Sequence, residues 1–170
     1  LIIIGLIIYS SIQSYYIIEG NFEKDSIYPE NIKYIILGIM VCVVVEIIIG
    51  TEIRGGLDIS RKENPLIEGV ILLKMLGPFK YIHTILGVIL LGLVFYLRKI
   101  LQNTNSFPSD YMIYAVNFML IIIGVQIVLG ESLVLFDVKP LVQLFHMWFS
   151  SLLLGLSIVQ YTFWKISNSV

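Results

Sequence analysis

The sequence predicts an all-α protein, a polytopic helical bundle in a membrane. Hydrophobic residues make up 58% of the chain, and the mean hydropathy is +0.92, which is more apolar surface than one water-soluble core can bury. Several apolar runs are long and continuous, and they lack the period-two alternation of an outer-membrane strand. Since backbone groups in lipid must be bonded within their own segment, runs of this kind are expected to be helices.

Each predicted span is an apolar run close to the length that crosses a bilayer, about 17 to 25 residues. In chain order the runs cover 1–18, 33–51, 79–97, 112–130 and 140–164. The first begins at Leu1 without a methionine or a basic stretch, so it does not resemble a signal peptide. We expect Leu1 to lie within a helix of a longer protein.

The segment 52–78 is predicted to be a long interfacial loop. Its stretch PLIEGVILLKMLGP is too short to span, so we expect a helix lying along the membrane surface, with Glu68 and Lys74 toward water. The pair Gly55–Gly56 ahead of it predicts a tight turn.

Charge and cysteine content narrow the class further. A net charge of -1 gives no reason to expect a nucleic-acid partner. The single cysteine, Cys42, excludes a disulfide within the chain and is predicted to be a small core residue. The basic residues are balanced between the two predicted membrane faces, so they do not choose an orientation.

One sequence pattern occurs twice. VEIIIG at 45–50 matches VQIVLG at 125–130, and each copy is followed by a loop and then by a helix with one histidine. These are the two histidines of the chain, His83 and His146. Repeats in a membrane bundle often share a site at their interface.

The predicted topology places both histidines at one level. Their helices begin on the same membrane face, and the rings lie roughly 6 and 9 Å below the helix starts at about 1.5 Å per residue. One turn further on, the small residues Gly87 and Ser150 leave room for a ring. Two imidazoles between apolar walls are what an iron porphyrin requires. Arg54 and Lys80 are placed to meet its propionates, with Arg61 and Lys62 as competitors.

Other interpretations fit the same residues. An intramembrane histidine also forms structural hydrogen bonds, small residues also permit close helix packing, and basic residues also meet lipid headgroups. Glu46 has Gln126 as its counterpart in the repeat, which favours a shared structural hydrogen bond over chemistry. Glu52 and Glu131 are interpreted as solvated residues at the water boundary.

The motifs together resemble the C-terminal half of haem A synthase. They are GTEIRGGLD, KYIHTILG and VQIVLGESLVLFDVKPLVQLFHMWFSSLLLG, and the resemblance covers about residues 33–165. It implies a four-helix haem-binding half over 33–170, preceded by one extra transmembrane helix at 1–18 that ends a preceding N-terminal half. It also implies that His83 and His146 are the axial ligands of a haem b.

The resemblance implies an oxidoreductase that converts the C8 methyl of haem O to the formyl group of haem A for cytochrome oxidase assembly. The catalytic glutamate proposed for the family stands three residues before the first histidine of the other half. Here that spacing holds Lys80. The catalytic residues therefore stay unassigned and are expected in the missing N-terminal half.

The implied surroundings are a lipid bilayer, haem O synthase and oxidase assembly factors. The membrane would be the bacterial cytoplasmic or mitochondrial inner membrane, with both histidines near its extracytoplasmic face. Two alternatives remain: a bis-histidine b-type electron-transfer cytochrome without its own chemistry, and a helical transporter subunit in which Glu46 and Arg54 line a polar pathway.

Overall fold

The computed structural model describes residues 2–19, 28–103, 110–136 and 138–168. Its helices are α1 (Ile2–Glu19), α2 (Glu30–Glu63), α3 (Gly69–Met75), α4 (Phe79–Asn103), α5 (Asp110–Leu135) and α6 (Pro140–Asn168). Within these residues, α2, α4, α5 and α6 are long and apolar enough to cross a membrane. The predicted helical membrane bundle is confirmed. The first predicted span forms α1, and its crossing of the membrane stays a prediction.

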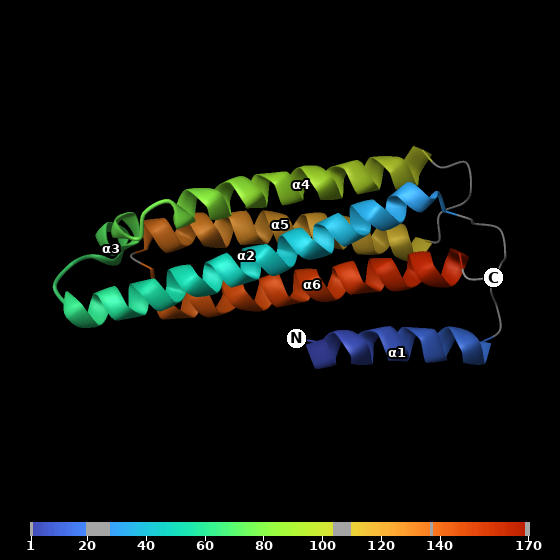
Figure 1. The fold of residues 1–170 in the computed structure, drawn as a ribbon, viewed down its shortest axis with the longest axis horizontal. Coiled ribbons are helices and arrows are strands. Elements are labelled where there is room, and N and C mark those ends of the chain that lie inside the picture. Colours follow the sequence, from blue (N-terminus) through green and yellow to red (C-terminus); the bar gives the residue numbers. More distant parts are fainter. Residues whose placement is uncertain (1, 20–27, 104–109, 137, 169–170) are drawn as a thin grey trace.

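The four long helices form an up-and-down bundle (Figure 1). Around the bundle, α2 contacts α4, α4 contacts α5, α5 contacts α6, and α6 contacts α2. This cyclic order places α4 and α6, the helices with the histidines, on one diagonal. Helix α1 packs outside the bundle against α6. At the end where α4 and α6 begin, α3 lies beside the last turns of α2 (Figure 1).

Apolar packing is concentrated in the half of the bundle away from α3. The main core cluster draws on α2, α4, α5 and α6 through Ile32, Ile36, Ile39, Val43, Leu90, Val94, Leu97, Met112, Val116, Met119, Leu153 and Trp164, among others. Membrane helices gain stability from such close packing, because lipid offers no hydrophobic drive to associate.

The histidine half lacks a comparable core. Across 44–56, 79–89, 124–136 and 140–152, the single buried residue is Gln143. Protein interiors are normally filled by interlocking side chains. The apolar side chains of these ranges are therefore at most partly buried, among them Ile47, Leu86 and Phe149.

The predicted turn at Gly55–Gly56 is wrong, because α2 continues without interruption to Glu63. At Gly56, an added Cβ would lie 2.6 Å from Leu76 Cδ2, so the missing side chain permits close packing of α2. Among the described glycines, Gly77 is the one with positive φ, at 71°. The sharp turn thus falls between α3 and α4. The predicted loop 52–78 begins only at Asn64, because α2 extends to Glu63.

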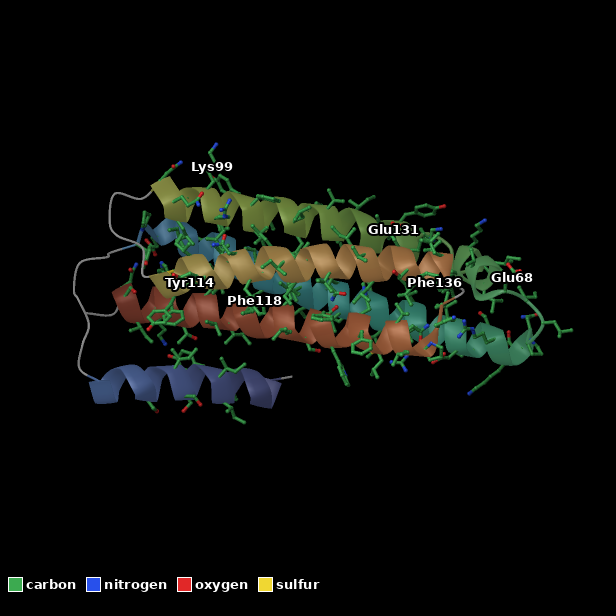
Figure 2. All side chains as sticks on the ribbon, turned by 180° about the vertical axis from the view of Figure 1, so that it is seen from behind. Glu68, Lys99, Tyr114, Phe118, Glu131 and Phe136 are labelled. Carbon is green, nitrogen blue, oxygen red and sulfur yellow. The ribbon has the colours of Figure 1, made fainter. Side chains whose placement is uncertain are left out.

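The predicted short helix is present as α3, with seven residues, and its position along the membrane surface stays a prediction. Leu72 is buried against Leu57 and Val138, while Glu68 and Lys74 are exposed. Figure 2 shows Glu68 at the same end of the molecule as Glu131 and Phe136, with Lys99 and Tyr114 at the other end. Helix α4 runs to Asn103, six residues past its predicted end. Most of the predicted connections 19–32 and 98–111 lies outside the described residues.

Candidate functional site

The two histidines face each other across the bundle. His83 stands in the second turn of α4 and His146 in the second turn of α6. Their ring centroids are 6.2 Å apart, with an angle of 62° between the ring planes. The repeat predicted two imidazoles at one level, and the structure brings them together.

Glu46 lies directly beside the first ring. Its Oε2 contacts His83 Nδ1, and the side chains of Glu46 and His83 are 11% and 28% exposed. The contact is not an aligned hydrogen bond, because His83 Nδ1 and Glu46 Oε1 have no hydrogen-bond partner within the described part of the chain. Glu46 is well inside α2, because this helix continues past the predicted end of the span at residue 51 to Glu63.

Gln126, the counterpart of Glu46, contacts its helix partner differently. Its Nε2 donates to the backbone oxygen of His146, at 2.9 Å, and to Ser150 Oγ. Ser150 Oγ donates to the same carbonyl, at 3.0 Å. Gln126 therefore makes a structural hydrogen bond, to the backbone of α6, but the predicted bond is not shared, because Glu46 Oε1 has no hydrogen-bond partner among the described residues. His146 Nδ1 is buried and has no hydrogen-bond partner among the residues that are described.

Small residues surround both rings. An added Cβ at Gly50 would lie 3.6 Å from His83 Cε1, and one at Gly130 would lie 3.8 Å from His146 Cε1. Both glycines end a copy of the repeat, VEIIIG and VQIVLG. This shared position could have predicted their place beside the rings, but they are assigned no role from the sequence. Gly87 lies opposite Glu46, since a Cβ there would be 3.9 Å from Oε1. Ser150 is engaged in the hydrogen bonds above.

Among the basic residues predicted for the site, Arg54 on α2 contacts a residue next to a histidine. Its Nη1 is 2.7 Å from the sulfur of Met147, the residue after His146. Arg61 donates to the carbonyl of Val138, at 3.1 Å. Lys80 lies with its Nζ 5.0 Å from the centroid of Tyr81. Arg54 thus contacts a side chain next to His146, whereas the contact described for Lys80 is with its neighbour Tyr81.

The donor set fits a metal that carries its own equatorial ligands. The described residues contain no group of three or more His, Cys, Asp or Glu side chains that could hold a bare ion. Bare ions usually take four or more ligands, whereas a haem iron needs one or two axial ligands from the protein. With metal–nitrogen bonds of about 2 Å, two imidazoles on opposite sides of one metal have ring centroids about 6 Å apart.

The same centroid distance also falls within the ordinary range for two aromatic rings in edge-to-face contact. Two further observations favour a ligand. His146 Nδ1 is buried and unpaired, and the bundle around both rings has almost no buried apolar residues. The residues present therefore fit a haem held between α4 and α6.

Comparison with protein families gives a match. The model described as cytochrome oxidase assembly protein matches residues 1–158. Comparisons with curated proteins and with solved structures found no match. The match covers α1, the whole histidine half of the bundle and most of α6. The chain belongs to the haem A synthase family of cytochrome oxidase assembly proteins.

Proposed function

We propose that this chain is the haem b-binding half of a haem A synthase, the membrane oxidoreductase that converts the C8 methyl of haem O to the formyl group of haem A. The observation that carries the proposal is the facing pair His83 and His146, 6.2 Å apart on diagonal helices. Family membership supports a role in haem A synthesis and oxidase assembly.

In this proposal the two histidines hold the haem, and Arg54 binds a propionate at the membrane surface. A haem with two axial imidazoles supplies one-electron transfer. The protein's own contribution is to hold both imidazole rings at the same depth and to shield them from water within the bundle. It also places a cation where the propionates of the haem would lie. Arg54 is suited to this because its guanidinium binds carboxylates in a bidentate manner.

The methyl oxidation itself is assigned to another part of the enzyme. Lys80 occupies the position that corresponds to the family's proposed catalytic carboxylate. An ammonium group cannot accept a proton at that position. We therefore propose that haem O binds in an N-terminal half with its own histidine pair, and that the bundle described here passes electrons to it.

The test is haem retention by the purified chain and by His83→Ala and His146→Ala. Each variant should lose most of its haem, because one axial ligand is removed. Thr84→Ala and Ser151→Ala are matched controls, since both hydroxyl groups donate to carbonyls of their own helices. The controls should keep their haem. Full retention in both histidine variants would contradict the proposed ligands.

A bis-histidine electron-transfer cytochrome without chemistry of its own is the second candidate. It is favoured by Lys80, which leaves this half without the family's catalytic carboxylate. The two functions are distinguished by incubating the complete protein with haem O and a reductant in the presence of oxygen. Haem A among the products supports the synthase, and reversible reduction without haem A supports the cytochrome.

A further inference from the structure

We propose that Glu46 is a positioning residue that acts through His83 and makes the two axial imidazoles chemically unequal. The inference deepens the proposed function and depends on it, because it concerns the residues that would hold the haem. It assigns to an intramembrane carboxylate a role that neither the family match nor the sequence interpretation gave it.

The carboxylate of Glu46 is in direct contact with the ring of His83. Glu46 Oε2 lies against His83 Nδ1, and Glu46 Oε1 has no hydrogen-bond partner within the described residues. Among the described residues, no hydrogen-bond donor therefore binds Oε1 of this carboxylate. A carboxylic side chain at 11% exposure inside a candidate membrane helix is costly, and such residues usually serve a partner in the bundle.

The other copy of the repeat has a different side chain beside its histidine helix. Gln126 occupies the same place in VQIVLG as Glu46 does in VEIIIG. Gln126 donates to the backbone carbonyl of His146 rather than to its ring, and His146 Nδ1 stays unpaired in the described structure. Within the described residues, a carboxylate thus contacts the ring of one imidazole, whereas no side-chain contact to Nδ1 of the other is found.

A carboxylate at the second ring nitrogen changes how an imidazole binds a metal. A histidine that binds a metal usually donates its second ring N–H to a carboxylate, a carbonyl or water, which fixes the tautomer and increases the basicity of the ligand. With Glu46 at Nδ1, His83 would bind through Nε2 and donate more electron density than His146. Stronger donation favours ferric over ferrous iron and lowers the reduction potential.

The space around the carboxylate is consistent with this role. A Cβ at position 87 would lie 3.9 Å from Glu46 Oε1, and one at position 50 would lie 3.6 Å from His83 Cε1. Glycines at both positions leave space beside the ring and the carboxylate, because an added Cβ would be in no more than ordinary van der Waals contact. The small residue at position 87, expected to leave room for a ring, here faces the carboxylate.

The test measures haem content and midpoint potential in Glu46→Gln and Glu46→Leu. Glu46→Gln installs the residue of the second copy and keeps a neutral acceptor, so haem should be retained while the potential rises. Glu46→Leu removes the acceptor, and haem affinity should fall about 10- to 100-fold, as for other carboxylate partners of metal-bound histidines. Glu52→Gln is the charge-matched control, since Glu52 is exposed further along α2.

The outcomes separate the two claims. A raised potential in Glu46→Gln with an unchanged potential in Glu52→Gln supports the positioning role. An unchanged potential in Glu46→Gln overturns it, even if haem is bound and both histidines are needed. Absence of haem in the unmodified chain contradicts the proposed function itself. Thermal unfolding of each variant identifies any change that comes from general loss of stability.

Discussion

The residues next to the histidines hold them in different ways. Glu46 contacts the ring of His83, whereas Gln126 and Ser150 both bind the backbone oxygen of His146. The sequence predicted the histidine pair because its repeat fixes type, order and depth. It could not distinguish the two contacts, since a ring and a carbonyl are reached from the same helix position by different rotamers.

The first prediction concerns Gln126. Gln126→Leu removes the donor to the His146 carbonyl, and the free energy of unfolding should fall by about 0.6 to 1.7 kcal/mol, the range found for hydrogen bonds between membrane helices. Ser150→Ala should cost less, because Gln126 loses one of its two acceptors but still donates to the His146 carbonyl. Thermal unfolding in detergent measures both. An equal loss in the two variants would contradict the importance of the interhelical bond.

At the scale of the helices, α2 is the element that differs most from its prediction. It has 34 residues, which at about 1.5 Å each exceeds the roughly 30 Å of a bilayer core. The tight turn at Gly55 and Gly56 is predicted only from the local conformational preference of glycine. The close approach of Leu76 to Gly56 is a tertiary contact, and a single sequence does not show such contacts.

The second prediction uses the three glycines. Gly55→Ala should stabilise the protein by about 0.5 to 1 kcal/mol, because alanine is the better helix former and nothing lies within 4 Å of the added Cβ. In Gly56→Ala, displacement of the Leu76 side chain should cancel part or all of this gain.

Gly77→Ala should instead be destabilising, since Gly77 has φ 71° and alanine is strained there. Chemical or thermal unfolding of the three variants gives the order. If Gly55→Ala and Gly56→Ala were both as destabilising as Gly77→Ala, the chain would turn at the glycine pair, contrary to the continuous α2.

At the scale of the whole molecule, the bundle has one packed half and one half organised around the histidines. The sequence predicted that α4 and α6 begin at the same end, and the structure confirms it (Figure 1). The diagonal placement of these helices could not be predicted, because hydropathy gives the spans and not their neighbours. The same holds for the uneven distribution of the core.

The third prediction concerns orientation. Asn64 lies at the α3 end, after α2, and Asn103 ends α4 at the opposite end. In a Cys42→Ala background, Asn64→Cys should react with an impermeant thiol reagent added from outside the cell, and Asn103→Cys should not. The expectation follows from the proposed extracytoplasmic position of the histidines. Labelling of Asn103→Cys from outside would reverse the orientation.

The central claim is that His83 and His146 bind one iron from opposite sides, and visible spectroscopy of the purified chain tests it most directly. We expect a low-spin b-type spectrum in the reduced-minus-oxidised difference, unchanged when carbon monoxide is added, because both axial positions are filled by imidazole. A spectrum that shifts with carbon monoxide would show an open axial position. That result, or the absence of haem, would contradict the account.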